Sequence, residues 1–183
     1  MPLALIDLDG TLADYDGAIA DRMFGDRHLQ EIGLEKARHL ISAEPGFFLN
    51  LKPLPDGFMI VEVLRELGFS FHVATKGPRT KPLAWTEKLM WCDKHLPGIP
   101  VTITSDKSLI RGDVLVDDWP PYVEAWLRAN PNGKAIMPFR SYNDAWVDDA
   151  LRHEVFGEGR LFQYGINYLT YERLFSNFAK DLE

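Results

Sequence analysis

The sequence contains a single cysteine, Cys92, among its 183 residues. One cysteine excludes an intramolecular disulfide, and such sparse use is typical of proteins in a reducing compartment. No apolar run approaches the roughly 20 residues that a membrane-spanning helix needs. The amino terminus enters a predicted strand directly, without the basic stretch and apolar segment of a signal peptide. We therefore expect a cytoplasmic protein without a membrane anchor.

Positive charge is also scarce. Lys and Arg number 20 against 27 Asp and Glu, which gives a formal net charge of −7. Proteins that bind long nucleic acids usually have a basic face, so this balance argues against such a partner. A small anionic substrate is still compatible with it, provided that a cation and one or two lysines gather around that substrate. The oligomeric state is left open, with a homodimer as one option.

Histidine gives no sign of a metal site. The five histidines show none of the spacings that are typical of paired metal ligands. They are His28, His39, His72, His95 and His153. We interpret them as surface or packing residues, so a metal in this protein would need oxygen ligands.

Short apolar segments alternate with helical patterns along the chain. Five of these segments predict strands: Leu3–Ile6, Phe71–Ala74, Val101–Thr104, Val114–Val116 and Ala135–Met137. Strands that alternate with helices imply right-handed crossovers and a mostly parallel sheet. The sequence therefore predicts an α/β fold, with a Rossmann-like parallel sheet flanked by helices.

Three helices are predicted between these strands. The first carries apolar residues at helical spacing from Ile60 to Leu67, and the third begins at Pro120. The second should bury one apolar stripe. That stripe consists of Trp85, Leu89, Cys92 and Leu96, and Trp91 should also pack in the core. The tail predicts one more packed helix, through Tyr171, Leu174, Phe175 and Phe178.

Residues 15–52 interrupt the alternation. They look helical and lie between the first strand and the next helix–strand unit. An insertion there would stand over the carboxyl end of the sheet as a lid. We therefore divide the chain into a core, residues 1–14 and 53–183, and a small helical cap, residues 15–52.

Two carboxylates, Asp7 and Asp9, follow the first predicted strand, just where the chain turns at Gly10. Open α/β sheets bind their ligands at the carboxyl ends of the strands. An EF-hand is the other loop of this kind, but it needs glycine at its sixth position and no preceding strand, so it does not fit. A polar strand end beside a glycine turn is the plainer interpretation, and alone the motif does not exclude it.

Three further polar groups follow other predicted strands. They are Thr75-Lys76-Gly77, Asp106-Lys107 and Asp117-Asp118. Each has an ordinary explanation, as a turn, a solvated lysine or a helix N-cap. Together they would bring charged and hydroxyl groups from four strands to one point. Clustered carboxylates need a cation to stay ionised, and an oxygen-rich set suits Mg²⁺.

Such a cluster is suited to phosphoryl transfer. One carboxylate can attack phosphorus, and a second, two residues further along, can protonate the leaving alkoxide and then deprotonate water. Thr75 and a lysine would bind the phosphoryl oxygens, while Mg²⁺ would offset the charge between nucleophile and phosphate.

These motifs resemble those of the haloacid dehalogenase superfamily of phosphatases. The match consists of Asp7-Leu-Asp-Gly-Thr-Leu, then Thr75, a lysine, and Asp117-Asp118. The resemblance implies that Asp7 is the nucleophile and Asp9 the acid and base. It also implies that Mg²⁺ is held by Asp7, by the backbone carbonyl of Asp9 and by Asp118. An Asp at the second position favours phosphoryl transfer over dehalogenation.

A closer resemblance is to the 5′(3′)-deoxyribonucleotidases. It rests on the segments 7–15, 47–55, 87–91, 104–107 and 113–118. It implies that Lys107 binds phosphate, with Lys88 as the rival lysine, that Asp117 supports Asp118, and that Tyr15 lines the nucleoside pocket. Two positions depart from the family pattern: Lys76 stands where Ser is usual, and Ser105 where Arg is usual. Lys76 becomes a further candidate phosphate ligand.

Phe47 and Phe48 are candidates for contact with the substrate. Aromatic rings can stack on a nucleobase, but these two are at least as well explained as core residues at the base of the lid. Trp119, beside the acidic pair, could also lie near the substrate.

The main hypothesis is a Mg²⁺-dependent phosphatase for (deoxy)nucleoside monophosphates that works through an aspartyl-phosphate. Alternatives are a phosphatase for a sugar phosphate or a polynucleotide 3′-phosphate, and a module that binds Mg²⁺ or a phosphorylated partner without catalysis.

Overall fold

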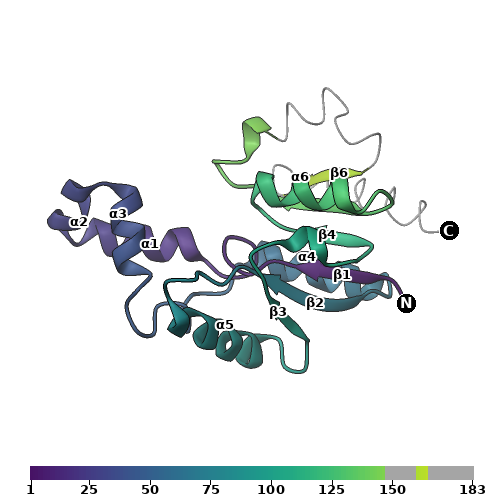
Figure 1. Cartoon of the computed structure of the whole chain (residues 1–183), viewed down its shortest axis with the longest axis horizontal. Helices are drawn as coiled ribbons and strands as arrows, with labels where there is room; N and C mark the ends of the chain where they lie inside the picture. The colour runs from purple at the N-terminus through teal and green to yellow at the C-terminus, as the bar shows by residue number, and fades with distance from the viewer. Residues whose placement is uncertain (147–159, 165–183) are drawn as a thin grey trace.

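The computed structural model describes residues 1–146 and 160–164. The helix predicted in the tail lies outside these residues. In the described part, the chain forms one six-stranded sheet in the order β3-β2-β1-β4-β5-β6 (Figure 1), and every paired strand is parallel to its neighbour. The strands are β1 (Leu3–Ile6), β2 (Ser70–Thr75), β3 (Val101–Ile103), β4 (Val114–Val116), β5 (Lys134–Pro138) and β6 (Leu161–Tyr164).

The predicted α/β fold is confirmed, and each of the five predicted strands is present within about a residue of its expected bounds. The sixth strand, β6, was not predicted. It pairs with β5 at the edge of the sheet, with Ala135 opposite Leu161. The strand order reverses direction beside β1, because the chain goes from β1 outward to β3 and then returns to β4 on the other side. Such a switch point is where doubly wound sheets bind ligands.

Helices cover both faces of the sheet. On one face, α4 (Pro55–Glu66) and α5 (Pro82–His95) pack against Ala4, Ile6 and Val116. On the other face, α6 (Pro120–Ala129) packs against Leu5 and Leu115. Successive residues of one strand therefore enter opposite cores, as the two-residue period of a strand buried on both faces requires.

The buried face of α5 differs from the predicted stripe. Trp91 and Cys92 are buried as expected, but Trp85 and Leu89 are 40% and 45% exposed. The face that turns inward also carries a charged pair, Glu87 and Lys88. Both charges have partners inside the protein, and those partners offset the cost of burying them. The rotation of this helix is thus set by polar contacts that an apolar pattern does not contain.

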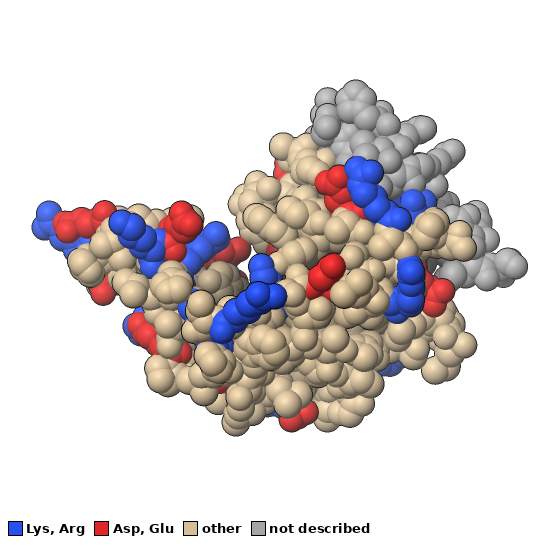
Figure 2. Space-filling model, in the orientation of Figure 1, with Lys and Arg blue, Asp and Glu red and all other residues tan. Residues whose placement is uncertain are grey.

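Three short helices lie between β1 and α4: α1 (Tyr15–Phe24), α2 (Arg27–Ile32) and α3 (Leu34–Ile41). They pack around a small core of their own, formed by Ile19, Leu29, Ala37 and Ile41. Figure 1 shows them projecting to one side of the sheet. On the face drawn in Figure 2, a notch separates this helical lobe from the rest of the molecule, and basic side chains gather beside it. Division into a core and a cap at residues 15–52 remains our proposal.

None of the helices in the described part of the chain has both the length and the apolar character needed to cross a lipid bilayer.

Candidate active site

The turn after β1 brings the first motif to the switch point. The Leu8 carbonyl accepts hydrogen bonds from the backbone N–H groups of Leu12 and Ala13, both at 2.8 Å. Gly10 has a φ of +78°, a conformation that side chains other than glycine rarely adopt. A Cβ on Gly10 would lie 2.4 Å from Asp118 Oδ2. The glycine is therefore required twice, by the turn and by the close approach of the acidic pair after β4.

Lys107 lies between two of the predicted carboxylates. Its Nζ is 2.5 Å from Asp7 Oδ1 and 2.6 Å from Asp117 Oδ2, and its side chain is 2% exposed. Burial alone would lower the pKa of Lys107, but the two carboxylates outweigh this effect and raise it. Lys107 therefore stays protonated, and we call Asp7, Lys107 and Asp117 the Lys107 cluster.

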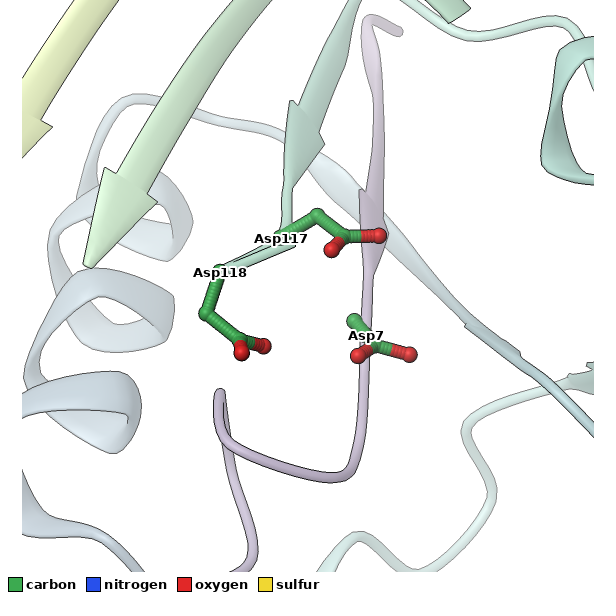
Figure 3. A group of neighbouring side chains, drawn as sticks. All are labelled: Asp7, Asp117 and Asp118. Carbon is green, nitrogen blue, oxygen red and sulfur yellow. The ribbon is translucent and has the colours of Figure 1, made fainter. Parts of the chain in front are cut away.

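Asp118 lies beside the two carboxylates that Lys107 contacts. Asp7, Asp117 and Asp118 each offer an oxygen, and these atoms all lie within 4.8 Å of one another (Figure 3). We call these three carboxylates the acidic cluster. One lysine cannot neutralise three carboxylates. Accordingly, burial and the charge of Asp7 raise the pKa values of both Asp117 and Asp118.

The donor set fits Mg²⁺. Three carboxylates supply only hard oxygen ligands, which Mg²⁺ prefers, and a divalent cation would balance the excess negative charge. In the described residues this is the single cluster of at least three acidic, histidine or cysteine side chains close enough to hold a metal. Asp117, expected to support the metal, lies in the cluster itself. The side chain of Asp9 does not belong to it.

A second buried lysine organises the opposite half of the site. Lys88 Nζ is 2.6 Å from Asp9 Oδ2, and it donates hydrogen bonds to Thr75 Oγ1 at 3.3 Å and to the Lys76 carbonyl at 2.7 Å. The Lys88 side chain is 1% exposed. We call Asp9, Thr75 and Lys88 the Lys88 cluster. The motifs after β1 and β2 thus meet through a lysine from α5.

Asp9 is only partly paired in this arrangement. Its Oδ1 is buried without a hydrogen-bond partner among the described residues. Burial raises the pKa of Asp9, the negative charge of Asp7 adds to this effect, and Lys88 opposes it. A carboxyl group with a raised pKa is suited to donate a proton near neutral pH.

The three aromatic candidates form one group beside the Lys88 cluster. The ring of Tyr15 contacts both Phe47 and Phe48, with centroids 5.5 and 6.1 Å apart. Phe48 is 5% exposed, and Lys88 Nζ lies 4.9 Å from its ring centroid. Glu87 fixes the segment, because its carboxylate accepts hydrogen bonds from Gly46 N and Phe48 N. Phe48 is thus a packing residue, while Tyr15 and Phe47 are partly buried.

Lys76 lies at the rim. Its side chain is exposed, with Nζ 5.6 Å from the centroid of the Tyr122 ring. Lys107 Nζ lies 5.0 Å from the same ring. Trp119 is 46% exposed and its ring lies 6.0 Å from that of Tyr142.

Sequence reasoning missed several residues that touch the site. Thr11 donates a hydrogen bond to Asp118 at 2.8 Å, Tyr142 donates one to the same carboxylate, and Asn143 and Arg140 bind nearby backbone. Thr11 belongs to the quoted first motif and could have been noticed there. The other three follow β5, where no metal- or phosphate-type pattern marks them.

Residues 1–160 match the protein-family model described as "5' nucleotidase, deoxy (Pyrimidine), cytosolic type C protein". A protein of Bordetella bronchiseptica, provisionally named 5'(3')-deoxyribonucleotidase, is 31% identical over 167 residues, covering 80% of this chain and 88% of its own. The mouse mitochondrial 5'(3')-deoxyribonucleotidase is 30% identical over 182 residues, covering 79% and 81%.

A solved structure has the same fold. It is a haloacid dehalogenase family hydrolase from Deinococcus radiodurans, solved with bound phosphate and sodium. It superposes with a TM-score of 0.54 at 14% identity and covers 98% of this chain and 96% of its own.

Proposed function

Since this chain belongs to the cytosolic type C family of deoxy (pyrimidine) 5′-nucleotidases, within the haloacid dehalogenase superfamily, and is a hydrolase of phosphoric monoesters, we propose that it hydrolyses (deoxy)nucleoside monophosphates with Mg²⁺ as cofactor. The nucleotide substrate is carried over from the names of its relatives. The reaction would pass through an aspartyl-phosphate, the acyl phosphate formed on Asp7.

The observation that carries this proposal is the different environment of the two carboxylates in the first motif. Asp7 Oδ1 lies 2.5 Å from Lys107 Nζ, and Asp7 belongs to the group of carboxylates that could hold the cation, a position suited to a nucleophile. Asp9, two residues further along, has a raised pKa, which favours the protonated form that a general acid needs. Two carboxyl groups in such different surroundings can divide the roles of nucleophile and acid.

In the first step, a carboxylate oxygen of Asp7 attacks phosphorus, and the bond from phosphorus to the ester oxygen breaks. Asp9 donates its proton to the departing alkoxide. In the second step, Asp9 takes a proton from water, which attacks phosphorus, and the bond to Asp7 breaks. Inorganic phosphate leaves, and both carboxyl groups return to their initial states.

Four side chains are candidates to hold the phosphoryl oxygens. Thr75 and Lys88 lie on the Asp9 side, Lys107 lies on the Asp7 side, and Lys76 stands at the rim. Lys88 already contacts the hydroxyl of Thr75 and the carboxylate of Asp9, so a phosphoryl group beside Asp9 would lie within its reach. This contact favours a direct role for Lys88 alongside Lys107.

Mg²⁺ would be held by Asp7 and Asp118, with Asp117 beside them and the Asp9 backbone carbonyl as the ligand that the superfamily resemblance implies. When bound, it would offset the charge between the nucleophile and the phosphate. The partly buried rings of Tyr15 and Phe47 would face the nucleoside.

The proposal is tested by phosphate release from a panel of nucleoside monophosphates, sugar phosphates and oligonucleotides with a 3′-phosphate, with and without Mg²⁺. We expect release from nucleoside monophosphates, and a loss of about 10⁴-fold or more in Asp7→Asn. Asp113→Asn is the matched control. Asp113 Oδ2 accepts a hydrogen bond from Leu3 N at the amino-terminal ends of β1 and β4, opposite the ends that carry the site. Release from sugar phosphates alone would contradict the nucleotide substrate, and undiminished release by Asp7→Asn would contradict the nucleophile.

A further inference from the structure

The segment that follows β5 encloses Asp118 from a strand that carries none of the predicted motifs. The Tyr142 hydroxyl donates a hydrogen bond to Asp118 Oδ2, and the Thr11 hydroxyl donates one to Asp118 Oδ1. Asn143 Nδ2 donates to the Asp118 carbonyl at 2.9 Å. Both the side chain and the backbone of Asp118 are therefore held by two consecutive residues of this segment.

Asn143 is itself fixed in position. It is fully buried, and its Nδ2 also donates to the Pro138 carbonyl at 2.9 Å, while its Oδ1 accepts from Arg140 N at 3.0 Å. All three of these bonds run between the Asn143 amide and backbone groups. The side chain therefore connects the end of β5 to the backbone that follows β4.

Arg140 extends the connection to the first motif. Its Nε donates to the Gly10 carbonyl at 2.8 Å, and its guanidinium pairs with Asp56 at the start of α4, 2.7 Å away. Residues 140–143 thus contact both parts of the chain that carry the acidic cluster: the turn after β1 and the aspartate pair after β4.

Asp118 would lose its orientation without these contacts. Its neighbours Asp7 and Asp117 share its charge, and mutual repulsion favours a rotation of the Asp118 carboxylate away from them. The hydroxyl groups of Tyr142 and Thr11 oppose that rotation, because each binds a different oxygen. Groups that hydrogen-bond a metal ligand commonly set metal affinity in this way.

We propose that Tyr142 and Asn143 are positioning residues that set the affinity of the acidic cluster for Mg²⁺. The inference rests on the proposed function, since it takes Asp118 as a ligand of the cation. Neither residue needs to touch the substrate for this role.

The test measures binding of Mg²⁺ alone by titration calorimetry at pH 7.5, without any substrate. Tyr142→Phe removes only a hydroxyl and keeps the ring that packs near Trp119. Asn143→Ala removes the amide, and with it both donated hydrogen bonds, without adding a charge beside Asp118. We expect each variant to bind Mg²⁺ about 10-fold or more weakly.

Asn130→Ala is the matched control for a purely structural loss. Asn130 is also buried, and its Nδ2 donates to the Trp126 carbonyl at 3.0 Å, beyond the end of α6 and away from the acidic cluster. It should lower the melting temperature and leave Mg²⁺ affinity unchanged. Equal Mg²⁺ affinity in wild type, Tyr142→Phe and Asn143→Ala would overturn the positioning role while leaving the phosphatase proposal intact. If wild type binds no Mg²⁺, the inference is overturned too. Phosphate release measured without added metal would then show separately whether the protein is a phosphatase.

Discussion

The two halves of the site are each built around a buried lysine, but the lysines meet different demands. Lys107 contacts two carboxylates, Asp7 and Asp117, and all three side chains are almost completely buried. Lys88 contacts one carboxylate and two uncharged oxygens, and the side chain of its acidic partner Asp9 is 27% exposed. The Lys107 cluster is therefore closed to solvent, whereas the Lys88 cluster is partly open.

This difference indicates a division of work. In the Lys107 cluster the lysine offsets the cost of burying two carboxylates, because an unpaired buried charge costs several kcal/mol. In the Lys88 cluster, one oxygen of Asp9 has no hydrogen-bond partner within residues 1–146 and 160–164, and the lysine donates to uncharged oxygens. Such groups can exchange their present partners for a phosphoryl group at little cost. The first cluster should thus matter most for stability and metal binding, and the second for substrate binding and proton transfer.

Removing Lys107 should have the largest effect. Lys107→Met leaves Asp7 and Asp117 buried without their cation, so we expect the free energy of unfolding to fall by about 3–5 kcal/mol. Because Mg²⁺ would replace the lost positive charge, added Mg²⁺ should recover part of this stability. Urea unfolding with and without Mg²⁺ measures both effects. A variant as stable as wild type in metal-free buffer would contradict the stabilising role of Lys107.

Asp9→Asn should impair catalysis without weakening the metal site. Loss of the proposed general acid should slow turnover by about 10²-fold or more. Mg²⁺ affinity should be unchanged, because the Asp9 side chain pairs with Lys88 and does not lie in the acidic cluster. Calorimetry with Mg²⁺ and steady-state kinetics on one sample separate these effects. A large fall in affinity would show that the carboxylate itself binds the ion.

Lys88→Met tests the Lys88 cluster by removing its lysine instead of its carboxylate. Its removal leaves Asp9 able to reach water or to take up a proton, so the loss of stability should be smaller than for Lys107→Met, about 1–3 kcal/mol. The Michaelis constant should rise about 10-fold if Lys88 binds phosphoryl oxygens, a cost typical of one charged hydrogen bond. Identical unfolding curves and substrate affinities for the two lysine variants would remove the distinction between the clusters.

The sequence predicted the parts of the molecule that depend on local patterns. Short apolar runs found the strands β1 to β5, and polar residues at their ends indicated which groups share one edge of the sheet. The exposed side of α5 was predicted wrongly, because Glu87 and Lys88 are buried through contacts with residues that are remote in sequence.

The segment after β5 was missed for the same reason. Tyr142 and Asn143 gain their importance only from the fold, which brings them to Asp118. Nothing in the surrounding residues distinguishes a tyrosine that hydrogen-bonds a candidate metal ligand from one on the surface. Residues that act directly on a ligand follow recognisable spacings, whereas residues that support them can come from any neighbouring strand.

The smallest effect is expected from Cys92→Ala, on the buried face of α5 one turn beyond Lys88. Burial raises the pKa of this thiol to about 12, so it stays protonated and uncharged at neutral pH. Removing one sulfur atom from the core should cost about 1 kcal/mol. Since the thiol would ionise only as the pH approaches 12, the pH–rate profiles of wild type and Cys92→Ala should superimpose between pH 5 and about 9. A divergence on the alkaline side would mean that a thiolate forms there, and that the packing beneath Lys88 is looser than its burial indicates.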